Sequence, residues 1–260
     1  MTPLDAAHAV MEAKPGDHAA RLRFYERLAD GEMFLLLEEE PSGDNLTPKV
    51  FDLEDGPVVL VFDTEERLAG FTGIPAPYAA LPGRVIAAQL AGQGIGLGIN
   101  LGAAPSSMLL PPEAVDWLAE TLVHGPDEVE ARPEAFHAPM GLPQALLEGL
   151  DAKLARAAGL ADHALLAGVT YAGGRRGHML ALVGAAPGAE GALARAVAEA
   201  LTFSGIEAGE MDVTFLGAAD PATAAMARVA LRFDLPQPEP REPTAPAAPG
   251  MDPSRPPILR

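Results

Sequence analysis

The chain has 260 residues, of which 48% are hydrophobic, so it is long enough for one large domain or two ordinary ones. It has no cysteine, which excludes disulfides, thiolate metal ligands and cysteine nucleophiles and fits a cytoplasmic location. The net charge is −18, and residues 1–130, with 22 acidic and 7 basic residues, contribute −15. Such acidity disfavours nucleic-acid binding; it serves either solubility alone or contact with a basic protein partner.

The first 31 residues have the pattern of two helices. Apolar residues recur with helical spacing from Pro3 to Ala13, and Thr2 is suited to cap that helix before the proline. A second helical pattern runs from Asp17 to Ala29, and Gly31 follows it as a stop signal.

Short apolar runs then indicate β-strands. Met33 to Leu37 is one such run. Val50 to Leu53 and Val58 to Phe62 are two more, and the Asp-Gly step between them predicts a tight turn. Asp63 or Thr64 can cap a helix through Phe71.

Residues 82–122 continue this alternation. We expect a helix over Pro82 to Leu90, a strand over Gly94 to Leu101, a paired strand over Ser107 to Leu110, and a helix from Pro112 to Leu122. No charge occurs between Val85 and Pro112, but the glycines and prolines of this stretch break it into short elements, so we expect no membrane span.

The second half restarts after a predicted linker over 124–141. Its pattern predicts an α-β-β-α-β-α order within 142–234: helix Pro143 to Ala158, strands Leu165 to Tyr171 and His178 to Val183, helix Glu190 to Leu201, strand Met211 to Leu216 and helix Ala222 to Leu231. Residues 235–260 hold nine prolines and few large apolar residues, so we expect a disordered tail.

Three passages of the first half together resemble one known family. They are Val50–Gly56 running into Val59–Leu68, Gly96–Gly102 and Leu109–Val115. These match motifs of the SseB N-terminal domain, the family named for enhanced serine sensitivity. The second half is similar in element order to the SseB C-terminal domain, with that domain's final aromatic motif reduced to Arg232-Phe233-Asp234. The resemblance implies little chemistry, because the family offers no established catalytic residues to transfer.

The glycine string Gly92-x-Gly94-x-Gly96-x-Gly98 is the most conspicuous candidate for ligand binding. It lacks the spacing of a dinucleotide-binding or phosphate-binding loop. A period of two places the glycines on one strand face, where another segment can pack closely or, alternatively, a ligand can approach Gly96, Gly98 and Asn100.

Acidic residues provide the second candidate surface. Glu38, Glu39 and Glu40 follow one predicted strand, and Asp52, Glu54 and Asp55 surround the predicted turn. We expect them to contact a basic protein rather than a metal, because they lack the spacing of a calcium loop. The six histidines lack metal-ligand spacing, and no nucleophile motif, cofactor motif or catalytic residue is evident.

These observations predict an α+β (mixed α/β) protein with two compact domains, each a small mixed sheet flanked by helices. The expected ranges are 1–123, the linker 124–141, 142–234 and the disordered proline-rich tail 235–260. We expect a non-enzymatic protein-interaction or regulatory module that binds an unidentified, basic protein through its acidic first domain, without a cofactor, metal, nucleic acid or membrane. The alternatives are a small-molecule-binding or weakly catalytic protein with a site near Asn100, and self-association through the second domain's sheet edge.

Overall fold

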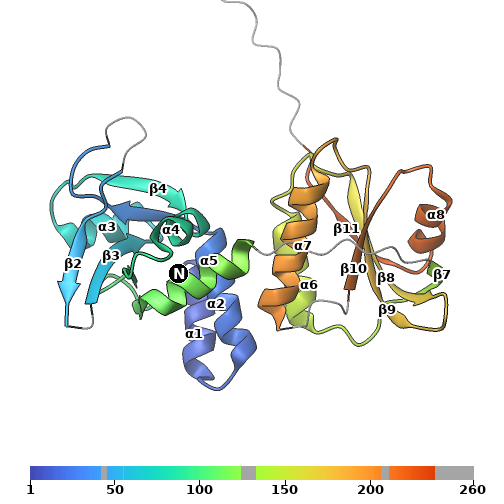
Figure 1. Cartoon of the computed structure of the whole chain (residues 1–260), viewed down its shortest axis with the longest axis horizontal. Helices are drawn as coiled ribbons and strands as arrows, with labels where there is room; N and C mark the ends of the chain where they lie inside the picture. The colour runs from blue at the N-terminus through green and yellow to red at the C-terminus, as the bar shows by residue number, and fades with distance from the viewer. Residues whose placement is uncertain (42–45, 55, 124–132, 206–210, 238–260) are drawn as a thin grey trace, which may run out of the picture.

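The computed structural model describes residues 1–41, 46–54, 56–123, 133–205 and 211–237. Over these ranges the chain forms two compact α+β units, each with a small mixed sheet and helices packed on it, as Figure 1 shows. The predicted fold class is therefore confirmed. Within the described ranges, no helix has both the length and the apolar character needed to cross a bilayer.

The first domain has five helices and six strands in its described part. In chain order they are α1 (Pro3–Ala13), α2 (His18–Asp30), β1 (Glu32–Leu36), β2 (Val50–Leu53), β3 (Gly56–Phe62), α3 (Glu65–Thr72), β4 (Tyr78–Pro82), α4 (Gly83–Leu90), β5 (Gly96–Ile99), β6 (Met108–Leu110) and α5 (Pro112–Val123). The sheet order is β4-β1-β3-β5-β6, and β2 pairs with β3. The β3–β5 pair is parallel, whereas the other pairs described in this sheet are antiparallel.

The apolar run of β3 supplies both faces of this sheet. Val59 and Val61 belong to the larger core, which they share with α1, α2, α4 and α5. Leu60 and Phe62 belong to a smaller core on the other face, where Leu68 of α3 packs. Successive side chains of a strand point to opposite faces, so a continuous apolar run is what a strand covered on both sides requires.

Two features of this domain differ from the sequence expectation. Strand β4 was not predicted, and it pairs along β1 as an edge of the sheet. The predicted strand over Gly94 to Leu101 is shorter, because Gly92 and Gly94 lie in a turn with φ of 73° and 68°, values that a strand does not have. The glycine string is therefore not one strand face.

The second domain contains three helices and five strands among its described residues. They are β7 (Pro133–His137), α6 (Gln144–Leu154), β8 (His163–Tyr171), β9 (Arg176–Val183), α7 (Glu190–Ser204), β10 (Met211–Leu216), α8 (Pro221–Ala227) and β11 (Leu231–Asp234). The sheet order is β10-β9-β8-β11, and β7 also pairs with β8. Helices α6 and α7 pack on one face of the sheet, and α8 packs on the other.

The structure of the second half differs from the sequence expectation at three places. Pro133–His137 form a strand on β8 within the range expected to be a linker, while residues 124–132 are outside the described part. Leu231, expected to end the last helix, begins a strand instead. Leu235, expected in a disordered tail, is only 4% exposed and joins the core of the second domain. Residues 238–260 of the predicted tail are outside the described part.

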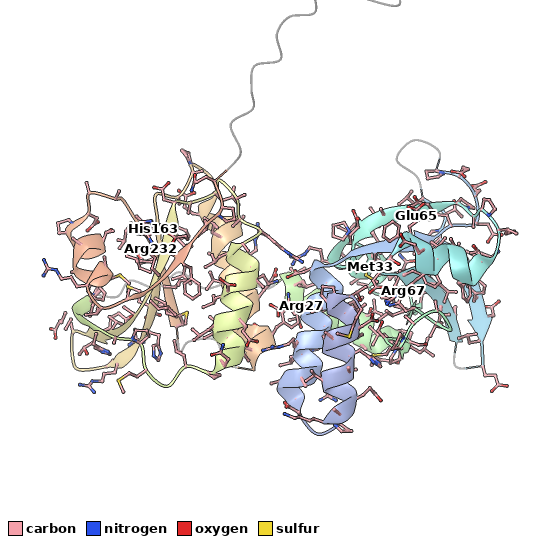
Figure 2. All side chains as sticks on the ribbon, turned by 180° about the vertical axis from the view of Figure 1, so that it is seen from behind. Arg27, Met33, Glu65, Arg67, His163 and Arg232 are labelled. Atoms are coloured by element: carbon pink, nitrogen blue, oxygen red, sulfur yellow. The ribbon has the colours of Figure 1, made fainter. Side chains whose placement is uncertain are left out.

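The two domains meet through α2 and α4 on one side and α6 and α7 on the other (Figure 1). Phe203 of α7 is 2% exposed and belongs to the core cluster of the first domain. Four charged side chains, Asp30, Arg84, Lys153 and Glu199, surround this contact and are called the interdomain cluster below. Figure 2 shows the molecule from behind. In this view α2, on which Arg27 is labelled, lies on the side of the first domain that faces the second.

One buried carboxyl at this interface is not part of an ion pair. Glu26 of α2 is 4% exposed, and its Oε1 atom has no hydrogen-bond partner. That oxygen faces α6, because a Cβ atom on Gly149 would lie 3.8 Å from it. Burial raises the pKa of Glu26, since the ionised form has lost its water.

Replacement of Glu26 by Gln tests that burial. A raised pKa in the folded state means that the unfolded chain gives up the Glu26 proton first, so the wild type loses stability as the pH rises above about 4.5. We expect Glu26→Gln to match the wild type near pH 4 and to be more stable at pH 8, as measured by urea unfolding. Equal pH dependence in the two proteins would show that Glu26 ionises normally.

Gly83, at the start of α4, is the position where the helix packing leaves least space. An added Cβ atom would lie 1.9 Å from the carbonyl oxygen of Leu28, and the backbone of α2 cannot move away without disturbing the core. We expect Gly83→Ala to lower the free energy of unfolding by about 1–3 kcal/mol. Gly70→Ala is the matched control, because Gly70 is exposed in α3 with open space around it, and we expect a gain of about 0.5–1 kcal/mol. Equal stability of the Gly83 variant and the wild type would contradict this packing.

Candidate functional site

Asn100 lies at the point where the two parallel strands of the first sheet end. Asp63 directly follows β3 and Asn100 directly follows β5, so both side chains reach the same edge of the sheet. In open α/β sheets, the carboxyl ends of parallel strands are a frequent place for ligands. Asn100 is fully buried and has a φ of 49°, a left-handed conformation that asparagine tolerates better than most residues.

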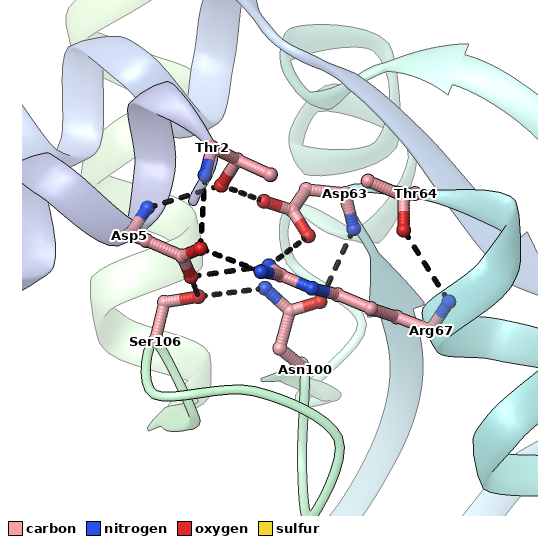
Figure 3. Close-up of polar contacts among 7 residues, drawn as sticks. All are labelled: Thr2, Asp5, Asp63, Thr64, Arg67, Asn100 and Ser106. Carbon is pink, nitrogen blue, oxygen red and sulfur yellow. Dashed lines mark hydrogen bonds and ion pairs between the residues drawn. The ribbon is translucent and has the colours of Figure 1, made fainter.

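The polar atoms around Asn100 bond to one another, as Figure 3 shows. The Asn100 side-chain oxygen accepts a hydrogen bond from the backbone N–H of Asp63 at 3.2 Å, and its Nδ2 donates to Ser106 Oγ at 2.9 Å. Ser106 Oγ donates in turn to Asp5 Oδ1 at 2.6 Å. Arg67 binds Asp5 through both terminal nitrogens, at 2.5 and 3.1 Å, and also reaches Asp63 at 2.5 Å.

The start of α1 closes this network. Thr2 and Asp5 form a capping box, in which each side chain accepts a hydrogen bond from the other's backbone N–H. Thr2 also donates its hydroxyl to Asp63 at 2.5 Å. The Arg67 guanidinium beside Asp5 holds the pKa of that carboxyl far below its usual range, although burial opposes the shift. These side chains, called the closed network below, connect α1 to the sheet and to α3, and their polar groups bond to one another. The members of the closed network are Thr2, Asp5, Asp63, Arg67, Asn100 and Ser106.

The three positions singled out for ligand approach have different surroundings. Asn100 belongs to the closed network. At Gly98 an added Cβ atom would lie 2.6 Å from Leu60 Cδ2 and 2.7 Å from Leu101 Cδ1, so side chains fill the space beside it. Gly96 alone of the three lines an open groove, which is described next.

This groove, the β2–β6 groove, has a volume of about 200 Å³. It lies across the starts of β3 and β5 and the ends of β2 and β6. The residues that line it are Leu53, Gly56, Pro57, Val58, Gly96, Leu109, Leu110, Pro111 and Pro112. All of these side chains are apolar, and Leu53 and Leu109 are 43% and 38% exposed at its rim. The absence of a side chain at Gly96 keeps the floor open, because a Cβ atom there would lie 2.8 Å from the carbonyl oxygen of Leu110.

The six acidic candidates do not form one cluster. Asp52 and Glu54 are exposed at the end of β2, directly beside Leu53 of the groove, whereas Asp55 lies outside the described residues. Glu38, Glu39 and Glu40 are exposed too, but they follow β1, and the backbone N–H of Glu38 donates to the carbonyl of Thr47, ahead of β2. The segment that follows β1 therefore lies near the start of β2, whereas Asp52 and Glu54 lie at its end, and β2 is labelled in Figure 1. Over the described ranges, no three His, Asp or Glu side chains come together closely enough to hold a metal ion.

The sequence singled out Gly96, which lines the groove, and Asp52 and Glu54, which flank Leu53 in the chain, but not the apolar side chains of the groove. A usable signal was present for Leu109. In a strand, Leu109 and Leu110 must point to opposite faces, so only one of them can join the main core. Leu110 does so at 1% exposure, which leaves Leu109 at the rim.

The closed network generates a prediction about acid stability. Asp5 has a lowered pKa in the folded state, so its contribution to stability is present above about pH 4 and is lost as the pH falls. Asp5→Asn removes the charge that pairs with the half-buried Arg67, and we expect a loss of about 2–4 kcal/mol at pH 7 and a smaller loss near pH 2. Urea unfolding at both pH values measures this loss of unfolding free energy. Glu66→Gln, at an exposed position of α3, is the control. An equal loss at both pH values would show that the Asp5 charge is not what stabilises the network.

Comparison with known proteins bears on the first domain. Residues 4–117 match the family model described as SseB protein N-terminal domain. A search of curated proteins and a search of solved structures each give no match. The matched range begins in α1 and ends in α5, so it contains both the closed network and the β2–β6 groove. The first domain of the chain is therefore similar to the SseB protein N-terminal domain.

Proposed function

We propose that this chain is a non-enzymatic protein-interaction module, and that its SseB N-terminal domain binds an extended segment of a basic protein in the β2–β6 groove. The bound segment places one apolar side chain in the groove and Lys or Arg residues beside Asp52 and Glu54. The observation that carries the proposal is the open apolar groove, whose wall residue Leu53 is flanked in the chain by the exposed Asp52 and Glu54.

The size and lining of the groove support a peptide anchor. A volume of about 200 Å³ is below the range of about 300–1,000 Å³ that pockets for drug-sized ligands occupy, but it accommodates one large side chain. Its walls offer apolar contacts from Leu53 and Leu109. Peptide recognition commonly combines such an anchor pocket with polar contacts around it.

Charge complementarity supports a basic partner. Asp52 and Glu54 make no ion pair within the described chain, in contrast to Asp5 and Asp63, which both pair with Arg67. The surrounding domain carries most of the chain's negative charge. Long-range attraction of this kind accelerates association with a basic segment and weakens as salt screens it.

The small-molecule alternative at Asn100 has less support, because the polar groups there already bond to one another.

Two further expectations extend the proposal. We propose that residues 142–234 are an SseB C-terminal domain, for which the order of helices and strands is the support. We also propose that the module acts in the cytoplasm, where a cysteine-free chain loses nothing to the reducing conditions.

Selection from a random dodecapeptide library on the immobilised full chain tests the proposed binding. We expect enriched peptides to share one large apolar residue flanked by Lys or Arg, and their dissociation constants to rise several-fold between 50 and 300 mM salt. Leu53→Ser combined with Leu109→Ser should weaken binding at least tenfold, because the anchor then lies against polar walls.

Matched variants separate the groove from the rest of the surface. Ile74→Ser changes an apolar side chain that is 71% exposed outside the groove, and it should leave peptide binding unchanged. Asp52→Asn with Glu54→Gln should reduce the salt dependence, whereas Glu12→Gln with Glu66→Gln should not. Peptides that bind the Leu53 and Leu109 variant as tightly as the wild type would refute the groove as the binding site.

A further inference from the structure

A larger cavity lies between the two domains, away from the β2–β6 groove. Its volume is about 490 Å³, within the range of pockets that hold small molecules, and domain interfaces are a preferred location for such pockets. Both domains line it. The lining residues are Asp30, Pro82, Arg84, Leu122, Lys153, Arg156, Ala157, Leu160, Ala192, Leu193, Arg195, Ala196 and Glu199.

The innermost polar wall of this cavity is the interdomain cluster. Lys153 Nζ lies 2.8 Å from Asp30 and 2.7 Å from Glu199. Arg84 binds both oxygens of Glu199, at 2.9 and 3.0 Å, and also pairs with Asp30. Two cations thus neutralise two carboxylates, whose side chains are only 6% and 5% exposed. The two positive and two negative charges of this wall therefore balance, and its charged side chains bond to one another.

Two more arginines line the cavity without such neutralisation. Arg156 donates to the backbone carbonyl of Asp30 at 2.7 Å and lies 3.5 Å from that residue's carboxylate, whose charge is already shared with Lys153 and Arg84. Its side chain is 54% exposed. Arg195 of α7 is exposed and makes no hydrogen bond or ion pair with the described residues. In a chain of net charge −18, this one cavity is therefore lined by four basic residues and two acidic ones.

The remaining walls are apolar. Leu160 and Leu193 face the cavity from the second domain, Leu122 and Pro82 face it from the first, and alanines fill the positions between. A ligand that suits both kinds of wall carries a negative group at one end and a compact apolar group at the other. Arginine is well suited to the negative group, because its planar guanidinium donates two parallel hydrogen bonds to a carboxylate or phosphate.

We propose that this cavity binds a small organic anion, whose carboxylate or phosphate group contacts Arg156 and Arg195 while its apolar group lies against the leucine and alanine walls. Because both domains supply the walls, the bound anion also links one domain to the other. The site is separate from the proposed peptide groove, so either can fail without the other.

Calorimetric titration of the full chain at low salt tests this proposal with four probes: benzoate, phenyl phosphate, inorganic phosphate and the neutral benzyl alcohol. We expect binding of benzoate or phenyl phosphate, and the tighter of the two identifies the preferred acid group. Benzyl alcohol and inorganic phosphate should each bind at least tenfold more weakly, because each lacks one half of the ligand. No binding of either aromatic anion at 10 mM would overturn the proposal.

Three variants locate the bound anion. Arg195→Gln should weaken its binding by about tenfold, the loss expected for one charge-assisted contact. The matched control is Arg228→Gln, since Arg228 is exposed at the end of α8 on the far face of the second sheet. Ala192→Trp should abolish binding by filling the cavity from an exposed helix position, with thermal unfolding as a check of the fold. Undiminished binding by both the Arg195 and Ala192 variants would place the anion elsewhere and refute the proposed site.

Discussion

Two buried carboxylates, Asp30 in the first domain and Glu199 in the second, determine how the halves of this protein fit together. Each needs a cation, and each is paired across the interface, Asp30 with Lys153 and Glu199 with Arg84. Burial alone would raise the pKa of Asp30, but the Lys153 ammonium and the Arg84 guanidinium lower it on balance. Ion pairs of this kind add little net stability when intact, but loss of one partner costs about 3–5 kcal/mol. They therefore act mainly by penalising any other arrangement of the domains, while Phe203 supplies the apolar contact.

The two candidate binding regions follow from how charge is distributed around this interface. The buried carboxylates of Asp5 and Asp30 are matched by arginine or lysine, whereas the buried Glu26 is not. Asp52 and Glu54, next to Leu53 of the β2–β6 groove, make no ion pair with the described residues, and we propose that they contact a basic segment. The interdomain cavity has the opposite balance, because α7 and the turn after α6 bring extra arginines to it. One acidic chain thus presents an apolar groove near two exposed carboxylates and a cavity lined by more basic than acidic residues.

Local patterns were enough to predict much of the fold. Thr2 and Pro3 marked the start of α1, and the Asp-Gly step marked the β2–β3 pair. Strands β4 and β7 were missed because prolines bound or begin them, and β7 is held by pairing with β8, which no local pattern reveals. The sites were harder to predict than the fold. Gly96 was singled out, but the groove depends on residues from four separate strands, and the interdomain cluster joins residues 115 and 123 positions apart in sequence.

The central claim is that the interdomain cluster joins the two domains into one cooperative unit. Urea unfolding followed by two signals tests it directly, because Trp117 in α5 is the chain's single tryptophan and reports on the first domain, whereas far-ultraviolet circular dichroism reports on both. We expect coincident transitions in the wild type and two separated transitions in Lys153→Met, which removes one of the two cations that Asp30 and Glu199 share. Separate transitions in the wild type, or a Lys153→Met protein that still unfolds in one step with unchanged midpoint, would contradict it.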